Sequence, residues 1–193
     1  MARPRSEAAH QAALAATVDI LVGDGVEGVT FEEVAARTGV ARSTLYRHFG
    51  SKEELVARAA GLCSFQVPTP DTGNLETDLR TLFQSYQEAE DARRLPDLLP
   101  LLLDEAPRSP EINDLVQRMA EERRRPLRTI LRLAQARGEV DAGLDLETAL
   151  AFLIGPFSYR RMIDRQAVTP EFRDTVLVLA LRALGVPKQA LTT

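Results

Sequence analysis

The sequence predicts an all-α protein of about nine helices, in which a three-helix unit with a helix-turn-helix precedes a larger antiparallel helical unit. Two observations lead to this prediction. Apolar residues recur at helical spacing along most of the chain, and glycine and proline clusters separate these periodic segments. Apolar residues also make up 45% of the 193 residues, which is enough for a sizeable core.

The first two helices are placed by their ends. An amphipathic first helix should stop at residues 23–25, where two glycines flank an aspartate. Thr30, followed three residues later by Glu33, is a capping box that opens a short second helix. This helix should end at Gly39, because glycine readily adopts the left-handed conformation of a sharp turn.

The next two helices follow the same logic. A third short helix is expected over residues 42–49, directly after the turn. A second capping box, Ser51 with Glu54, opens a fourth helix that should fray near the prolines of residues 68–70. We therefore expect a first domain over residues 1–55, with the fourth helix, from about residue 52, as the link to the rest.

The second domain, residues 56–193, should contain five more helices. They are expected over residues 75–86, 98–103, 112–136, 146–163 and 172–184. Pro126 should interrupt and kink the longest of them, and Gly138 should end it.

Residues 30–49 are predicted to form a helix, a tight turn and a second helix, which is the pattern of a helix-turn-helix. Proteins with this motif place the second helix in the major groove of DNA. Leu45 and Phe49 are four residues apart and should face the core. The side chains left for the outside are those of Arg42, Ser43, Thr44, Tyr46, Arg47 and His48.

Positive charge is concentrated on this stretch, although the chain has a net charge of −4. Residues 34–52 contain no Asp or Glu, but they contain three arginines, one lysine and one histidine. Such a stretch attracts the phosphates of a nucleic acid. Lys52 lies in the first turn of the fourth helix, where exposed amides and the helix dipole add to the attraction.

The stretch from Val29 to Leu55 resembles the DNA-binding domain of TetR-family transcriptional regulators. The resemblance is carried by VTFEEVA at 29–35, TGV at 38–40 and TLYRHFGSKEEL at 44–55. Residues 136–140 (ARGEV), 145–146 (DL) and 153–156 (LIGP) are similar to the C-terminal domain of one TetR subgroup. Together these segments extend the resemblance over nearly the whole chain, and it is most specific before about residue 60.

The resemblance implies operator contacts for seven positions: Thr30, Arg42, Ser43, Thr44, Tyr46, His48 and Lys52. It implies base contacts for Arg42 and Ser43. For Thr44, Tyr46, His48 and Lys52 it implies mostly phosphate contacts. Arg47 suits either contact. Ala41 departs from the family, which often has Ser or a similar helix cap there, so the third helix should begin less sharply.

Some residues have a second interpretation. His48 fits a buried core histidine as well as a phosphate donor, and Tyr46 fits a partly buried ring beside Leu45. Residues 23–28 spell the G-x-G-x-x-G of dinucleotide-binding proteins, but no strand precedes them, so a turn is favoured. Cys63 fits a small buried side chain better than a redox sensor.

The last two predicted helices are apolar nearly all round, which is typical of a helix buried on both sides. One side should face a second copy of the chain, which gives a two-fold homodimer, as the resemblance also implies. The expected interface residues are Ala149, Leu153, Pro156, Phe157, Val176, Leu179 and Ala183.

A small-molecule pocket is implied by the resemblance and fits the aromatic residues that lie after residue 60, although an ordinary core explains each of them equally well. The expected lining residues are Phe65, Phe83, Tyr86, Leu99, Leu102, Met119 and Phe152. No acidic or basic pair can be placed among them from the sequence, so we expect an apolar effector.

The sequence indicates no catalytic site, metal site or cofactor. The two histidines, His10 and His48, are far apart, and no nucleophile–base set or phosphate-binding loop appears. One cysteine, no secretory signal and no apolar run long enough for a bilayer lead us to expect a cytoplasmic protein that is not an enzyme and contacts no membrane.

The function predicted from these features is that of a sequence-specific transcription regulator, by the family's habit a repressor, which leaves a palindromic site in double-stranded DNA when an effector binds. Two alternatives stay open: an architectural DNA-binding protein that responds to no ligand, and a small-molecule-binding helical protein.

Overall fold

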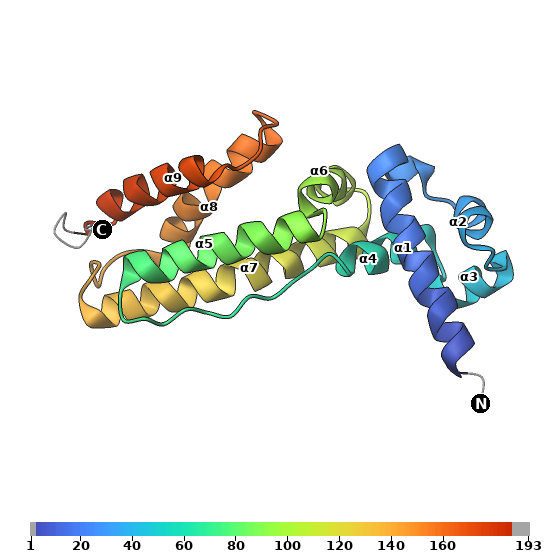
Figure 1. Ribbon diagram of the computed structural model, residues 1–193, viewed down its shortest axis with the longest axis horizontal. Helices are drawn as coiled ribbons and strands as arrows, with labels where there is room; N and C mark the ends of the chain where they lie inside the picture. The colour runs from blue at the N-terminus through green and yellow to red at the C-terminus, as the bar shows by residue number, and fades with distance from the viewer. Residues whose placement is uncertain (1–2, 187–193) are drawn as a thin grey trace. The chain divides into compact units, whose positions relative to one another are not determined.

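The computed structural model describes residues 3–186, and helices are its regular structure throughout that range (Figure 1). Four helices precede residue 62 and five follow. They are α1 (Arg3–Gly28), α2 (Phe31–Thr38), α3 (Arg42–Phe49), α4 (Lys52–Gly61), α5 (Leu75–Ala92), α6 (Leu95–Glu105), α7 (Pro110–Arg137), α8 (Leu146–Met162) and α9 (Pro170–Ala183). The all-α prediction and the expected number of helices are confirmed for the described residues.

These helices form two compact units. The first consists of the described residues up to Phe65 together with Arg93–Met119, and the second consists of Gln66–Ala92 together with the described residues from Ala120 onward. The first unit therefore holds α1 to α4, α6 and the start of α7, whereas the second holds α5, the rest of α7, α8 and α9.

The first helix breaks where the glycines predicted a stop. Gly25 has φ 71° and ψ −174°, which is not helical, and a last short stretch continues α1 to Gly28. A side chain with a Cβ rarely adopts a positive φ, so glycine allows the chain to change direction here. The G-x-G-x-x-G letters therefore lie at a helix end, with no strand before them among the described residues.

Two hydroxyl caps fix the ends of α2 and α4. The Glu33 amide donates to Thr30 Oγ1 at 3.0 Å, and the Glu54 amide donates to Ser51 Oγ at 3.0 Å. Both N-caps are as predicted. The glutamates do not complete the boxes, because their carboxylates bind arginines one turn later: Arg37 Nε lies 2.7 Å from Glu33, and Arg58 Nη2 lies 2.5 Å from Glu54.

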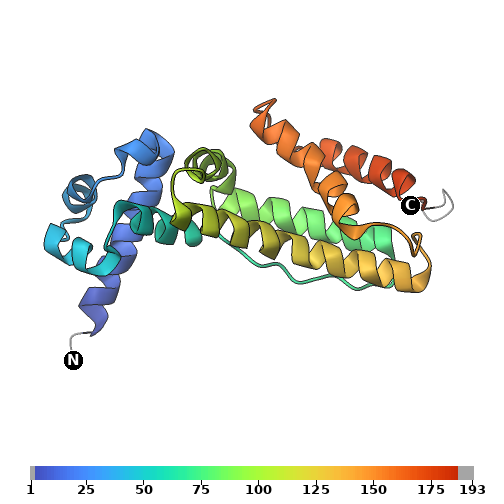
Figure 2. The same cartoon turned by 180° about the vertical axis from the view of Figure 1, so that it is seen from behind.

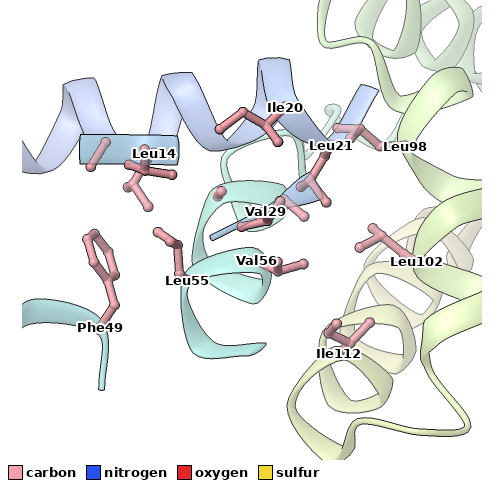
Figure 3. Packing of buried hydrophobic residues seen from close by; sticks show 14 of the residues in the cluster. Leu14, Ile20, Leu21, Val29, Phe49, Leu55, Val56, Leu98, Leu102 and Ile112 are labelled. Carbon is pink, nitrogen blue, oxygen red and sulfur yellow. The ribbon is translucent and has the colours of Figure 1, made fainter. Parts of the chain in front are cut away.

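The core of the first unit joins the helix-turn-helix to the helices behind it. Figure 3 shows Leu14 of α1, Phe49 at the end of α3 and Leu55 of α4 turned toward one another. Farther along the same cluster, Leu98 and Leu102 of α6 are fully buried. Because these side chains leave little room for independent movement, they hold α2 and α3 on a rigid support.

The second unit is built on two long helices. α5 and the later part of α7 lie side by side and run in opposite directions in both views (Figures 1 and 2). The predicted interruption at Pro126 is wrong, because α7 continues through this residue to Arg137. Gly138, whose φ is 73°, follows the last residue of the helix. α9 packs against α5 and α8.

None of the described helices has a stretch that is both long enough and apolar enough to cross a lipid bilayer.

Candidate nucleic-acid interface and candidate ligand pocket

The turn between α2 and α3 has the geometry that a helix-turn-helix requires. Gly39 has φ 72°, and its amide donates to the Ala35 carbonyl at 2.8 Å, which closes α2. α3 then anchors itself through Leu45 and Phe49, each only 1% exposed. Because these two residues occupy one face of a helix of only two turns, the opposite face is left at the surface.

The structure places the predicted DNA-contacting residues on or beside this surface. Arg42, Ser43, Tyr46 and Arg47 are exposed on α3, and Thr44 and His48 are half-buried at its sides. Thr30 is exposed as the N-cap of α2. Lys52 is half-buried in the first turn of α4, directly after the Ser51 cap. All eight residues thus lie within residues 30–52 of the first unit.

The start of α3 departs from that of α2 and α4. Its N-cap is Ala41, which makes no side-chain hydrogen bond to the helix. The Ala41 carbonyl still accepts from the amides of Thr44 and Leu45 at 2.9 and 3.2 Å. The helix therefore begins at Arg42 without a hydroxyl cap, as its sequence predicts.

Tyr46 combines the two interpretations that its sequence position left open. Its ring packs on Phe31 of α2 with 4.1 Å between the ring centroids, yet 51% of the residue is exposed. A contact of this kind fixes the ring without covering it. The side chain is therefore held in a defined place at the surface.

Acidic partners of the basic residues were missed by sequence reasoning. Arg42 Nη1 lies 2.7 Å from Glu32 Oε1, and Lys52 Nζ lies 3.9 Å from Glu27 Oε2. The hydrogen bond from Arg42 lowers the pKa of Glu32. Both glutamates precede the stretch without acids, and they reach it only because the helices fold back on one another.

Arg47 is the exposed arginine of α3 that has no ion pair among the described residues. Arg37, in contrast, is bound by Glu33 and also lies 3.2 Å from Asp24. The positive charge most available to a phosphate therefore lies in the last turn of α3, on Arg47.

His48 has an aromatic partner that the sequence did not suggest. His10 of α1 stacks on Phe49 at 4.9 Å between centroids, and its ring meets that of His48 edge-on at 5.9 Å. His48 is therefore positioned from α1 and stays only half-buried. Periodicity gives no signal for this contact, because the two histidines lie on different helices.

A hollow of about 10 Å³, which is about the room of one water molecule, lies in the second unit. Residues of α5, α7, α8 and α9, with Val168 from the loop before α9, form its walls. They are Phe83, Tyr86, Gln87, Glu90, Arg123, Phe157, Arg161, Val168 and Arg173.

Only two of the predicted pocket residues, Phe83 and Tyr86, belong to this hollow. Phe152 is 49% exposed on α8. The other four lie in the first unit, where Leu102 is fully buried and the rest are half-buried: Phe65, Leu99, Leu102 and Met119.

An ion pair network that the sequence did not predict borders the hollow. Glu90 is 1% exposed, and its two carboxylate oxygens each accept a hydrogen bond from a different arginine, Arg123 and Arg161. The Tyr86 hydroxyl donates to the Arg123 carbonyl at 2.6 Å. Burial raises the pKa of Tyr86, so its hydroxyl keeps the proton that it donates.

The predicted dimer residues differ in how far they are exposed. Ala149, Leu153, Phe157 and Val176 are buried within one copy of the chain, whereas Leu179 is 56% exposed and Ala183 is also exposed. Pro156 is half-buried. Phe152 and Tyr159 of α8, and Ile163 directly after it, are exposed apolar residues that the prediction did not assign to this interface.

Among the described residues, no cluster of three or more His, Cys, Asp or Glu side chains has a metal-binding arrangement.

Comparison with known proteins identifies both parts of the chain. Residues 13–59 match the model of the bacterial regulatory proteins of the tetR family, and residues 69–180 match that of the tetracyclin repressor-like C-terminal domain. An uncharacterized HTH-type transcriptional regulator of Mycobacterium tuberculosis, Rv1556, is 31% identical over 86% of this chain and 81% of its own.

Two further proteins extend this comparison. The DNA-binding transcriptional repressor TetR of Mycobacteroides abscessus is 31% identical over 76% of this chain and 77% of its own. The structure of the transcriptional regulator FadR from Bacillus subtilis in complex with stearoyl-CoA matches with a TM-score of 0.70. That match covers 89% of this chain and 97% of the other at 16% identity, so it shows a shared fold.

Proposed function

The chain belongs to the TetR family of helix-turn-helix transcriptional regulators, and we propose that it is a repressor released from a palindromic operator by a small-molecule effector. In this proposal residues 1–55 bind DNA, and residues 56–193 bind the effector and a second copy of the chain. A regulator of this kind acts in the cytoplasm and catalyses no reaction.

The observation that carries the proposal is the exposed face of α3. Arg42, Ser43 and Arg47 offer hydrogen-bond donors of the kind that read base edges and bind phosphates. Leu45 and Phe49 anchor the helix in the core, so these donors are presented by a rigid element. Thr30, Thr44, Tyr46, His48 and Lys52 are the proposed backbone contacts that hold α3 in register.

Dimer formation is supported by an exposed apolar stripe. Phe152, the half-buried Pro156 and Tyr159 are spaced so that they share one face of α8. Ile163, which follows α8 directly, continues this spacing, and Leu179 is exposed on α9. Exposed apolar stripes of this kind are typical of protein–protein interfaces. We propose this stripe as the two-fold interface, with Leu179 and Ala183 kept from the sequence prediction.

A dimer explains why the operator should be palindromic. Two copies related by a two-fold axis present two α3 helices in opposite directions, so they read inverted half-sites. The centres of the half-sites are then separated by one or more turns of DNA, each about 34–36 Å.

Effector control is supported by the hollow between α5, α7, α8 and α9. Its aromatic walls suit the apolar body of a small molecule. FadR, which shares the fold, is described in complex with stearoyl-CoA. For this chain we propose an effector that binds the DNA-incompetent state more tightly, because only such a difference in affinity shifts the population.

The test is selection of a random double-stranded DNA library on the purified chain, followed by sequencing. We expect an inverted repeat, and we expect Arg42→Ala to weaken binding of that repeat by about 5- to 150-fold. Enrichment of no sequence, with affinity that depends on salt alone, would contradict the proposal and favour an architectural DNA-binding protein.

A further inference from the structure

The hollow in the second unit carries more positive charge than its carboxylate neutralises. Glu90 provides one negative charge, whereas Arg123 and Arg161, which both bind it, provide two positive charges. Arg173 also borders the hollow, but Asp174 lies 3.2 Å from its Nε. The formal charges of Glu90, Arg123 and Arg161 therefore sum to +1, next to a hollow about as large as one water molecule.

Arg123 also has unused hydrogen-bonding capacity. Its Nε is buried and has no hydrogen-bond partner among the described residues. Guanidinium groups present five donors in a planar fork that matches a carboxylate. A buried donor without a partner costs free energy, so a ligand that accepts this hydrogen bond gains affinity.

The other walls are apolar. Phe83 and Phe157 pack with their ring centroids 4.9 Å apart, and Val168 closes the space beside them. A ligand that fits both parts of this lining needs an anionic end and an apolar body. The expectation of a purely apolar effector depended on the absence of charged pairs, and Glu90 with its two arginines removes that premise.

We propose that the arginines around Glu90 form the polar end of the effector site, and that the effector is an amphipathic carboxylate. This inference rests on the proposed function and specifies the effector of its ligand site. Arg123 and Arg161 already bind the two oxygens of the planar Glu90 carboxylate. A ligand carboxylate has the same planar pair of oxygens, so it can accept hydrogen bonds from the same arginines.

The size of the hollow indicates how such a ligand enters. A volume of about 10 Å³ does not hold a whole amphipathic molecule, so the walls must separate when it binds. The ligand carboxylate takes over one arginine from Glu90, and its apolar body moves in between Phe83 and Phe157. Binding is thereby coupled to a displacement of α5, α7 and α8, on which these residues lie.

The experiment is calorimetric titration of the full chain, without DNA, with octanoate and benzoate and with their neutral amides, octanamide and benzamide. We expect saturable binding of at least one carboxylate and about ten- to hundredfold weaker binding of its amide. Arg161→Gln should weaken carboxylate binding by a similar factor and leave amide binding unchanged. The matched control is Arg132→Gln, which removes an exposed arginine of α7 outside the hollow.

A second variant guards against loss of folding. Val168→Phe fills the hollow and keeps every charge, so it should abolish carboxylate binding while the thermal unfolding transition remains cooperative. Equal affinity for acid and amide would overturn the inference, as would unchanged binding by Arg161→Gln or no saturable carboxylate binding.

Release from the selected operator distinguishes this inference from the proposed function. A neutral compound that releases the operator, with no carboxylate bound, would overturn the inference and leave the proposed function intact. A carboxylate that binds in the hollow and leaves the operator complex unchanged would support the carboxylate site but contradict effector release, and with it the role of that carboxylate as effector.

Discussion

At the scale of single residues, the proposed DNA-binding surface contains a carboxylate that competes with DNA for Arg42. Arg42 is bound by Glu32 in the free protein, and the pKa of Glu32 is lowered by that hydrogen bond. A base or phosphate that binds Arg42 must first displace this carboxylate. The pair is exposed and weak, so it costs the complex little, but it opposes indiscriminate binding to phosphates.

We predict that Glu32→Gln raises affinity for non-operator DNA severalfold and reduces the ratio of operator to non-operator affinity. The reason is that one repulsive charge leaves the interface and Arg42 becomes free. Fluorescence anisotropy on both DNAs over a series of salt concentrations measures the change. Glu88→Gln, at an exposed position of α5, makes the same change in net charge and should have no effect.

Cys63 belongs to the same scale. It is 6% exposed, and burial raises the pKa of its thiol, an effect that the nearby charges of Arg93 and Arg94 only partly oppose. A raised pKa means a smaller thiolate fraction at any pH below it, and the thiolate is the form that reacts. We predict slow alkylation by iodoacetamide in the native protein and fast alkylation in urea, as measured by mass spectrometry. Equally fast native reaction would show an accessible thiol.

At the scale of helices, what could be predicted from the sequence depended on whether the signal was local. Thr30, Gly39 and Ser51 act within three or four residues, and each was predicted with its role. Ala41 was likewise identified as a missing cap. Local hydrogen bonds and φ preferences determine such features, so no knowledge of the tertiary fold is needed.

The inner and outer faces of α8 could not be predicted in the same way. Phe152 and Phe157 are equally apolar, yet Phe152 is 49% exposed and Phe157 is buried. A helix that is apolar nearly all round has no periodic signal to separate its faces. Nor could the Glu90–Arg161 pair be found, because 71 positions separate the two residues and no local pattern connects them.

We predict that Thr30→Ala and Ser51→Ala each lower the free energy of unfolding by about 1 kcal/mol, because each removes the oxygen that accepts an amide hydrogen at a helix start. Urea unfolding followed by circular dichroism measures the change. Ser43→Ala is the control: Ser43 is exposed and caps no helix, so its effect should stay within about 0.5 kcal/mol. A similar loss in all three variants would contradict this account.

At the scale of the whole molecule, the proposed dimer makes two α3 helices act together. An α3 of two turns offers few contacts to DNA, so in this proposal two linked copies bind the operator as a bivalent unit. We therefore expect the proposed interface on α8 and α9 to affect DNA affinity as well as assembly.

We predict that the double variant Ile163→Glu with Leu179→Glu is monomeric, because it places one charge directly after α8 and one on α9, both within the proposed interface. Its operator affinity should fall by two orders of magnitude or more, as expected for about 10²–10⁴-fold avidity. Analytical ultracentrifugation and anisotropy measure the two effects. Leu103→Glu changes an exposed leucine of α6 and should remain dimeric. A dimeric double variant would exclude the proposed interface.

In the proposed effector site, Glu90 affects how the regulator responds to the concentration of its effector. A carboxylate that belongs to the chain is present at a high local concentration that never changes, so an external carboxylate competes with it for the same arginines. If the effector is such a carboxylate, as we propose, traces of weakly binding metabolic acids leave the protein in its resting form. The response then begins only when the apolar body of an incoming acid adds enough binding energy to outweigh Glu90, which sets a threshold concentration and excludes small hydrophilic anions.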